Sequence, residues 1–436
     1  MSRVRSRRAL ALLVGLAVTA ATAGVTVPLI AGGRAEGGGP STNGASVSSL
    51  AFEERLASMS WEEILTEARG QTVYWYMWGG SDLINRYVKG YLAGRLREEY
   101  GVTLQMVPVT DAAVFVNKVL GEKQAGRNTR GSVDLVWING ENFRTMRQAD
   151  LLFGPYADRL PNMRYVNAAD PSVAYDFGFP VEGYESPYGS AQVVMIYNSA
   201  KVPSPPATVA GLLDWIRANP GRFTYPGMPD FTGSVFVRHL FYHAAGGYER
   251  LLGPFDPERF DEIAPRTWRL LKDLEPYLWR QGRTYPESRT ALQELFANGE
   301  VYFDVSYNPV EAASLIAQGR YPDTARTFVF DSGTIGNTHY VAIPFNSSSK
   351  AGAMVLANLL LDPAAQYEKA RAEVWGDLTV LDLARLPVKW RESFEALPRS
   401  EAVLPPEVLS KHRIPELQAS WLDAIEKGWV ENVLQK

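Results

Sequence analysis

Between residues 70 and 140 the chain alternates short apolar runs with segments of helical periodicity. Residues 71–78, 102–109 and 133–138 are rich in β-branched and aromatic side chains, which predicts three strands. Apolar residues recur on one helical face between the first two strands, and a second helix is predicted over residues 111–124. Strands separated by helices in this way predict a parallel or mixed sheet covered by helices.

The second half of the chain continues the pattern. Strands are predicted over residues 190–197, 300–306, 327–330 and 339–344, and helices over 209–218, 265–280, 287–297, 350–361, 363–373 and 416–434. The stretch 219–234 stands apart, because three prolines and two glycines precede Thr232 in it. We expect a short strand over 222–225, a shaped loop, and a new helix from Thr232.

Small polar residues follow several of these predicted strands. Ligands of such sheets bind beyond the carboxyl ends of the strands, which makes the segments 79–81 and 139–142 candidates for one rim of a site. The helix start Thr232-Gly233-Ser234 is expected to leave backbone N–H groups free to meet an acceptor. We therefore interpret 219–234 as one wall of a ligand site, although an ordinary capped helix after a proline-rich turn would have the same residues.

The first 49 residues have the composition of an export signal followed by a flexible linker. Four arginines precede an uncharged run over residues 9–31, and Ala21-Thr22-Ala23 has the small residues of a cleavage site. The pair Arg7-Arg8 leaves the twin-arginine route open, and an uncleaved run would be long enough to span a bilayer. Residues 32–49 are rich in Gly, Ser and Asn, so folded structure is expected near Leu50.

The length and net charge of the chain, together with its lack of cysteine, exclude several classes of function and site. A chain of 436 residues exceeds what one hydrophobic core usually organises, which predicts two lobes. Five of the 44 basic residues precede residue 36, which leaves 39 against 48 acidic residues and a net charge of about −9. A nucleic-acid partner is not expected, because it would need a basic face. The chain has no cysteine, which excludes disulfides, cysteine nucleophiles and thiolate metal sites, and we expect neither a metal nor a cofactor.

Several short motifs occur in a characteristic order. They are the strand at 73–78 with its β-α-β unit, Pro187-Tyr188-Gly189, Tyr197-Asn198, Pro205-Pro206-Ala207-Thr208, Asn298-Gly299-Glu300, Ser306-Tyr307-Asn308-Pro309 and the strand at 339–344. This order resembles the extracellular solute-binding proteins (family 1) of ABC importers, over nearly the whole exported chain. The segments 75–85 and 219–234 are most similar to the YnjB-like branch of that family.

The resemblance implies an α/β fold of the periplasmic-binding-protein type II, with two α/β lobes whose mixed sheets are joined by crossing strands. We expect residues 50–187 with 335–375 in the first lobe, and 188–334 with 376–436 in the second. The implied protein is no enzyme. It is an exported, periplasmic substrate-binding component of an ABC transporter, expected as a monomer, which captures a small-molecule ligand in an interlobe cleft and delivers it to the transmembrane subunits of the permease.

Residues at the cleft rims of both lobes are the implied ligand contacts. They are Trp78, Gly80, Ser81, Asn139, Glu141, Asn142, Tyr188, Thr232, Gly233, Ser234, Tyr307, Asn308 and Asn337. Trp78 and Tyr307 suit a flat or cationic group with Glu141 as its counter-charge. The helix starts at Ser81 and Thr232 suit a carboxylate or phosphate instead. The expected ligand is therefore a small charged metabolite, such as a thiamine-like, polyamine-like or phosphorylated compound.

Two other classes of protein remain open. An exported hydrolase would need a pair of carboxylates, and Asp304 with Glu141 is the pair to examine. His239 and His243 have the spacing of metal ligands, but no glutamate lies between them, so the zinc-protease pattern is absent. A membrane-tethered sensor domain of the same fold would follow if the segment 9–31 were not cleaved.

Overall fold

The computed structural model describes residues 55–56 and 58–435. The predicted export signal, the linker and the expected start of the fold near Leu50 lie outside the described residues. The strands are β1 (Thr72–Trp78), β2 (Thr103–Val109), β3 (Leu135–Ile138), β4 (Leu152–Phe153), β5 (Tyr175–Asp176), β6 (Phe179–Pro180), β7 (Glu185–Gln192), β8 (Val194–Asn198), β9 (Phe303–Ser306), β10 (Ala325–Phe328), β11 (Thr334–Pro344) and β12 (Arg413–Ile414).

Helices lie between most of these strands. They are α2 (Trp61–Ala68), α3 (Asp82–Arg86), α4 (Ala93–Tyr100), α5 (Ala113–Gln124), α6 (Gly140–Gln148), α7 (Pro171–Ala174), α8 (Val209–Ala218), α9 (Phe231–Ala245), α10 (Pro257–Leu274), α11 (Arg289–Ala297), α12 (Glu311–Ala317), α13 (Lys350–Leu360), α14 (Pro363–Ala370), α15 (Val388–Glu395), α16 (Pro406–Lys411) and α17 (Ala419–Trp429). None of the described helices combines the length and the apolar character needed to cross a membrane.

The larger sheet forms the first lobe and extends from it towards the second at β12, and it has the strand order β12-β11-β3-β1-β2, with β4 and β7 also pairing with β11. Strand β1 is parallel to both β2 and β3, whereas β11 runs antiparallel to β3 and β7. The alternation of side chains along β1 buries Val73, Trp75 and Met77 completely in the core of this lobe. This confirms the strand predicted over residues 71–78.

The smaller sheet forms the second lobe and has the antiparallel order β10-β8-β9. Its helices include α8, which has the predicted bounds and begins where the side chain of Thr208 accepts a hydrogen bond from the backbone N–H of Gly211 (3.0 Å). Helix α9 is buried over most of its length, from Thr232 to Tyr242. Because α9 is almost wholly buried, the other elements of this lobe pack around it.

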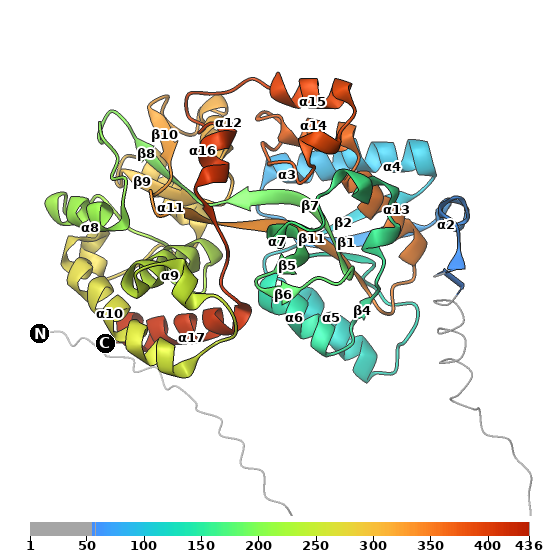
Figure 1. The fold of residues 1–436 in the computed structure, drawn as a ribbon, viewed down its shortest axis with the longest axis horizontal. Helices are drawn as coiled ribbons and strands as arrows, with labels where there is room; N and C mark the ends of the chain where they lie inside the picture. The colour runs from blue at the N-terminus through green and yellow to red at the C-terminus, as the bar shows by residue number, and fades with distance from the viewer. Residues whose placement is uncertain (1–54, 57, 436) are drawn as a thin grey trace, which may run out of the picture. The chain divides into compact units, whose positions relative to one another are not determined.

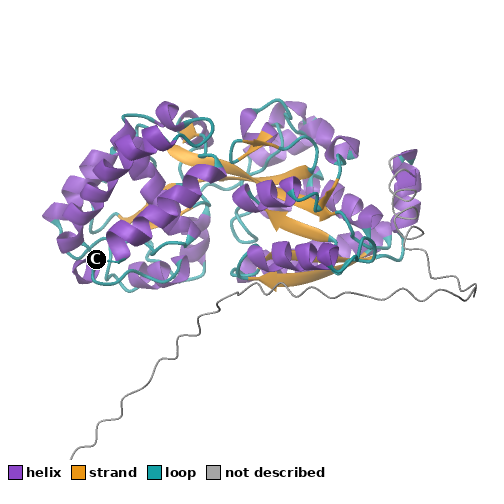
Figure 2. Ribbon diagram, turned by 90° about the horizontal axis from the view of Figure 1, so that it is seen from below, coloured by secondary structure: helices purple, strands orange, loops and turns teal. Residues whose placement is uncertain are grey.

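Two strands, β7 and β11, run from one lobe into the other, and we call them the crossing strands (Figures 1 and 2). Strand β11 begins beside β12 and ends beside β4. The strand predicted over 190–197 is in fact divided at Val193, whose N–H bonds the carbonyl of Ile335 (2.8 Å), so that β7 and β8 belong to different sheets. The predicted type II arrangement of two α/β lobes is thereby confirmed.

The hydrophobic cores show which segments pack in each lobe. One core joins β1, α13 and the late residues Leu381, Leu386 and Phe394. The segment 376–397, which we assigned to the second lobe, therefore packs with the first. Residues 402–433 do pack with the second lobe. The boundary was placed too early, because the apolar positions of a short helix do not show which of two sheets they cover.

Two local predictions were wrong. Residues 222–225 form no strand, since their carbonyls accept hydrogen bonds from loop residues, including Trp279 N–H to Phe223 (2.8 Å). The helix predicted to start at Pro265 starts at Pro257, where the Asp256 side chain caps it. Pro265 lies inside α10, which its buried apolar face stabilises against the core despite the missing N–H.

Candidate ligand-binding site

The last residue of β3 pairs with Tyr340 of the crossing strand β11, and the last residue of β9 pairs with Val194, at the start of β8. Most of the predicted ligand contacts lie at or after the carboxyl ends of β1, β3 and β9. Trp78 ends β1 and Gly80 and Ser81 follow it, Asn139, Glu141 and Asn142 follow β3, and Tyr307 and Asn308 follow β9. The start of α9, at Phe231, adds a further element from the second lobe.

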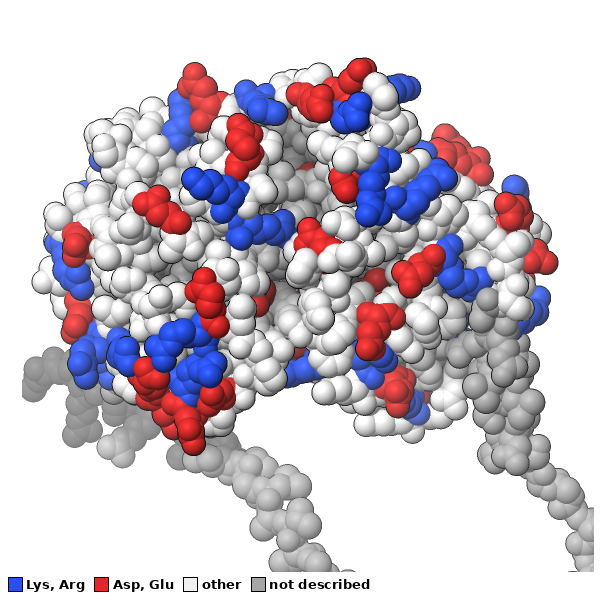
Figure 3. Space-filling model, viewed as in Figure 1, with Lys and Arg blue, Asp and Glu red and all other residues white. Residues whose placement is uncertain are grey.

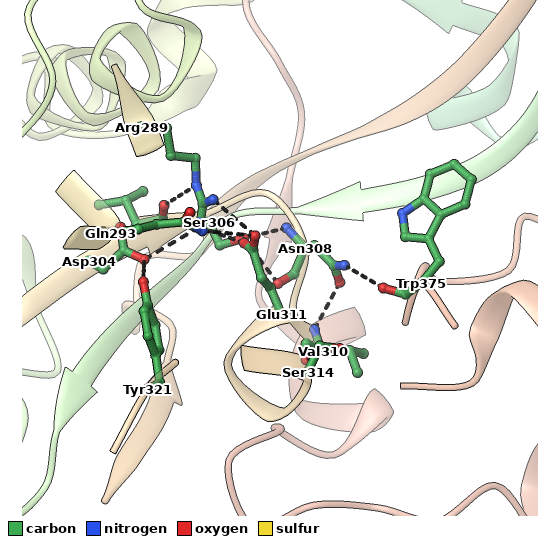
Figure 4. Close-up of polar contacts among 11 residues, drawn as sticks. Arg289, Gln293, Asp304, Ser306, Asn308, Val310, Glu311, Ser314, Tyr321 and Trp375 are labelled. Atoms are coloured by element: carbon green, nitrogen blue, oxygen red, sulfur yellow. Dashed lines mark hydrogen bonds and ion pairs between the residues drawn. The ribbon is translucent and has the colours of Figure 1, made fainter. Parts of the chain in front are cut away.

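Asp230 and Arg289 hold two of these loops together in the second lobe. One carboxylate oxygen of Asp230 accepts hydrogen bonds from the N–H groups of Thr232 (2.9 Å) and Gly233 (3.0 Å), and the other accepts from the N–H of Arg289 (3.1 Å). The guanidinium of Arg289 forms a two-pronged ion pair with Glu311 (3.0 and 2.5 Å; Figure 4). Arg289 thus connects the start of α9 to the turn after β9.

The turn after β9 is fixed by further hydrogen bonds. The hydroxyl of Ser306 bonds the Glu311 carboxylate, and the side chain of Asn308 accepts a bond from Val310 N–H (2.9 Å). The amide of Asn308 also donates to the carbonyl of Trp375 (3.4 Å), which belongs to the first lobe (Figure 4). Asn308 therefore joins the two lobes, and both of its side-chain ends are engaged within the protein.

The prediction of an anion-binding helix start at α9 was wrong. The N–H groups of Thr232 and Gly233 are not free, because Asp230 occupies them. At the start of α3, Ser81 accepts a hydrogen bond from the N–H of Ile84 (3.5 Å) and acts as an ordinary cap. The start of α9 therefore lacks the open set of N–H groups that a carboxylate or phosphate would need.

Gly233 is required by packing instead. A β-carbon at this position would lie 2.0 Å from the carbonyl oxygen of Pro226. We expect Gly233→Ala to lower the free energy of unfolding by about 1–3 kcal/mol. The matched control is Gly121→Ala in α5, where a β-carbon meets nothing within 4 Å. This change should raise the free energy of unfolding by about 0.5–1 kcal/mol. Urea unfolding followed by tryptophan fluorescence measures both, and equal effects would contradict the prediction.

Arg238 lies at the centre of the polar side chains behind these loops. Its side chain is completely buried, and its Nε is 3.1 Å from Glu416 Oε1. The guanidinium also donates to the hydroxyls of Ser234 (3.1 Å) and Tyr307 (2.5 Å). Two predicted site residues, Ser234 and Tyr307, are therefore brought together by an arginine that the sequence analysis missed.

An aromatic wall covers this arginine. The ring of Phe231 stacks on that of Tyr307, with 4.8 Å between centroids, and lies 5.5 Å from the Arg238 guanidinium carbon. Phe231 is 45% exposed although it is a large apolar side chain. The ring of Phe177, in the turn between β5 and β6, has its centroid 6.0 Å from that of Phe231 and packs in the core of the second lobe. The turn between β5 and β6 thus adds a further aromatic ring next to this wall.

Three carboxylates, Glu141, Glu416 and Glu426, surround the same place, and we call them the acidic cluster. Burial raises the pKa of all three, and the nearby Arg238 charge only partly opposes it. Glu426 accepts a hydrogen bond from the hydroxyl of Ser234 (3.1 Å). Oxygen Oε2 of Glu416 is buried without a hydrogen-bond partner among the described residues. Glu416 pairs with the guanidinium, Glu426 is connected to it through Ser234, and Glu141 is affected by its charge without a direct contact. The three carboxyl groups near one guanidinium are an excess of negative charge once they ionise.

The first lobe supplies Glu141 together with a buried aspartic acid. Asp176 accepts hydrogen bonds from the N–H of Gly140 (2.6 Å) and from the amide of Asn139 (3.3 Å). Asn139 also donates to the carbonyl of Thr338 in β11 (2.7 Å), and Asn142 donates to Glu141 (2.9 Å). The end of β3 is thereby tied to a crossing strand, with the Glu141 carboxylate beside it.

Three predicted residues have other surroundings. Trp78 is 45% exposed, and its ring lies over Gly80, where a β-carbon would come within 2.2 Å of the indole. The prediction that Tyr188 contacts the ligand was wrong, because this side chain is completely buried in the first lobe among Trp75, Trp137 and His339, where a solute has no access. The sequence around a strand residue that precedes a glycine does not show that both faces of the strand are covered.

Asn337, the last predicted contact, lines a separate pocket over the crossing strands. The residues missed by the sequence analysis are Arg238, Glu416 and Glu426. An arginine inside the apolar pattern Val235–Phe241 was the available signal for a buried charge, but its partners come from the end of the chain.

The carboxylate pair of a hydrolase is not assembled by Asp304. This side chain is buried, accepts a hydrogen bond from Tyr321 (2.6 Å) and pairs with Arg289 (3.4 Å; Figure 4). It supports the Arg289 connection and does not face Glu141 in any contact of the described chain. The two histidines of α9 also have no metal ligand set: Nδ1 of His239 lies 2.8 Å from the carbonyl of Val235, and Nε2 accepts from Ile335 N–H.

Comparisons with known proteins agree with this architecture. A family described as bacterial extracellular solute-binding protein matches residues 92–397. Three solved structures share the fold: an ABC transporter protein from Clostridium perfringens (TM-score 0.58, 16% identity, 83% of this chain and 99% of that one), the spermidine/putrescine substrate-binding protein PotD from Streptococcus pneumoniae (0.58, 16%, 84% and 99%), and the periplasmic binding protein AfuA from Actinobacillus pleuropneumoniae (0.54, 13%, 84% and 100%).

The chain belongs to the bacterial extracellular solute-binding protein family and is the solute-binding component of an ABC transporter. Such components act outside the cytoplasm, bind small ligands and interact with permeases. Among named relatives, protein YnjB of Escherichia coli (strain K12) is 41% identical over 379 residues, which cover 87% of this chain and 95% of the relative. The predicted resemblance to the YnjB-like branch is thereby confirmed.

Proposed function

We propose that the ligand is a small cationic solute, bound where the strand ends of the two lobes meet. The observation that carries this proposal is the acidic cluster beside an exposed aromatic wall, with Glu141 from one lobe and Glu416 and Glu426 from the other. An ammonium group is attracted both by carboxylates and by the face of an aromatic ring. Phe231 and Tyr307 supply such faces next to these acids.

The acidic cluster favours a cation over an anion. Its carboxyl groups have raised pKa values because burial removes them from water. A bound cation would replace that lost solvation and favour the ionised forms, whereas an anion would add to the repulsion. The N–H groups that would serve an anion are already occupied by Asp230.

The named ligands of fold relatives include both kinds of charge. The Streptococcus pneumoniae protein is a spermidine/putrescine substrate-binding protein, and the Actinobacillus pleuropneumoniae protein holds fructose-6-phosphate. Low sequence identity to both prevents a direct transfer of either ligand to this chain. The carboxylates around Arg238 support the amine, and the occupied N–H groups at the start of α9 argue against the phosphate.

The transport role follows from the two lobes. A solute that contacts both Glu141 and Phe231 would stabilise the form in which the lobes are closed, and this form would be the one that the permease recognises. In this proposal the protein is an exported monomer that captures and releases its solute unchanged, with no catalytic step.

Titration calorimetry with putrescine, and with fructose-6-phosphate as the anionic comparison, tests the proposal. We expect putrescine alone to bind, and Glu141→Gln to weaken it about 10- to 100-fold, as for the loss of a charged hydrogen bond. Phe231→Ala should weaken it about 3- to 30-fold, through the lost cation–π contact. Because binding ionises the acidic cluster, the affinity should also rise with pH.

The matched control is Tyr74→Ala, since Tyr74 is 44% exposed, much as Phe231 is, but lies within β1. It should leave putrescine binding unchanged. Binding of fructose-6-phosphate in place of putrescine would refute the cationic assignment. Putrescine binding that neither Glu141→Gln nor Phe231→Ala weakens would refute this location.

A further inference from the structure

A second pocket of about 1590 Å³ lies over the crossing strands, and we call it the strand pocket. Its floor includes Ser190 and Gln192 of β7 and the segment 336–338 of β11. Its walls come from α12 and α16 of the second lobe and from α14 and α15 of the first. The surface is hollowed between these helices (Figure 3). Of the predicted ligand contacts, only Asn337 lines this pocket.

Arg413 is the charged group on the floor of the strand pocket. It stands at the start of β12, which pairs in parallel with the first residues of β11. Its guanidinium donates to the hydroxyl of Ser190 in β7 (2.5 Å) and to the carbonyl of Asn337 in β11 (2.9 Å). One side chain therefore contacts both crossing strands and still has N–H groups to spare, because a guanidinium carries five.

No carboxylate of residues 55–56 and 58–435 lies within ion-pair distance of Arg413. Two other arginines of the second lobe differ in this respect: Arg238 pairs with Glu416 (3.1 Å), and Arg289 with Glu311 (2.5 Å) and Asp304. Carboxylates raise the pKa of those two arginines, whereas burial lowers that of Arg413 and the charge of Asp170 only partly opposes this effect. A partly buried charge whose counter-ion lies beyond ion-pair distance is costly, and a bound anion would reduce this cost.

The acids that line the strand pocket are engaged elsewhere. Asp377 pairs with Lys369 (2.7 Å) and His339, and Glu416 pairs with Arg238. Glu373 pairs with Arg371 (2.6 Å), and Asp170 caps α7 through the N–H and hydroxyl of Ser172. Asp176 is held in its protonated form near neutral pH, since burial raises its pKa to about 8. Asp170 keeps its charge and acts on Arg413 from beyond ion-pair distance, so none of these acids is a direct counter-ion of Arg413.

The walls of the strand pocket are largely aliphatic. Ile316 of α12, Leu397 beyond α15, and Leu404 and Leu409 near α16 line it. An occupant that pairs with Arg413 would therefore place apolar groups against these side chains. This combination fits a carboxylate with a short hydrocarbon body better than a bare inorganic anion, and a planar guanidinium pairs well with a carboxylate.

We propose that the strand pocket is a second ligand site and that it binds a small organic carboxylate through Arg413. The site differs from the acidic cluster in the charge of its ligand and adjoins it at Glu416, which lines the strand pocket. Because Arg413 contacts both crossing strands, an occupant would act on the segments about which the lobes move, and would couple to solute binding.

Titration calorimetry with hexanoate tests the proposal, with hexanol as its uncharged analogue and inorganic phosphate as the simple anion. Hexanoate should bind in preference to both. Arg413→Gln should weaken hexanoate binding about 10- to 100-fold, the expected effect of losing a charged hydrogen-bond partner. Arg413→Lys, which keeps the charge but not the planar fork, should have an intermediate effect.

Arg413→Gln removes contacts to two strands, so a variant that leaves them intact is also needed. Ala317→Trp adds a ring at an exposed position of α12 on the pocket wall and should weaken hexanoate binding too. The control is Arg399→Gln, at an exposed position of the same pocket. It should bind hexanoate as the unchanged protein does.

Several results would overturn the proposal. They are the absence of hexanoate binding, equal binding of hexanol, and hexanoate binding that neither Arg413→Gln nor Ala317→Trp weakens. Binding of phosphate alone, lost in Arg413→Gln, would overturn the assignment to a carboxylate.

Discussion

Replacing Arg238 with methionine should lower the free energy of unfolding by about 3–5 kcal/mol. The change leaves the carboxylate of Glu416 buried without its partner, because the two side chains are 0% and 4% exposed. It also removes the donors to Ser234 and Tyr307. Urea unfolding followed by tryptophan fluorescence measures the loss.

The control is Arg266→Met, which breaks an exposed ion pair with Glu262 in α10 and should cost at most about 1 kcal/mol. The double change Arg238→Met with Glu416→Gln should recover part of the loss, since no unpaired charge remains. If Arg238→Met costs no more than Arg266→Met, the buried pair does not have the role we assign to it.

The free energy of unfolding should also fall as the pH rises from about 6.5 to about 8. Asp176 explains this direction, because its pKa is about 8 in the folded protein and 3.8 in the absence of burial. Between these values the folded state binds one more proton than the unfolded state. Stability is then lost at up to about 1.4 kcal/mol per pH unit until the pH passes the folded pKa.

The pH range starts at about 6.5 so that the titration of two other groups does not affect the slope. Burial lowers the pKa of His239 to about 4, which makes stability rise with pH up to its ordinary value of 6.5. Asp304, with a pKa of about 6, acts in the opposite direction over part of the same range. Above about 6.5 neither of these two groups should contribute much to the slope.

Asp176→Asn tests the assignment, because asparagine keeps an acceptor for the N–H of Gly140 but has no proton to lose. In this variant the loss of unfolding free energy per pH unit should become smaller by the contribution of one proton. It should not vanish, since burial also raises the pKa of Glu185. Asp158→Asn, at an exposed position, shows whether the loss of any carboxylate has the same effect. An unchanged slope in Asp176→Asn would contradict the prediction.

Local patterns in the chain predicted most of the elements that position the site. Strand β1 follows from its apolar aromatic run, and helix α8 from its apolar face and the Thr208 cap. The ends of β3 and β9 were recognised because glycine, asparagine and proline follow them. These features depend on neighbours within a few residues, which the sequence contains directly.

The composition of the site could not be predicted in the same way. Arg238 and Glu416 meet only because α9 and the segment before α17 pack together, and no local pattern links them. The apparent free N–H groups of Thr232 and Gly233 were assigned without Asp230, whose side chain turns back onto them. Tyr188 has the same local surroundings as an exposed strand residue, but β11 and the adjoining aromatic rings enclose it.

The order of strands and helices, the motifs of the solute-binding family and the excess of acidic residues can all be read along the chain, because each depends on neighbouring residues or on simple composition. Which charges are buried and which of them form ion pairs were settled only by tertiary packing. The physical reason is that solvation and ion pairing depend on distances between atoms, and folding brings close together residues that lie far apart in the sequence.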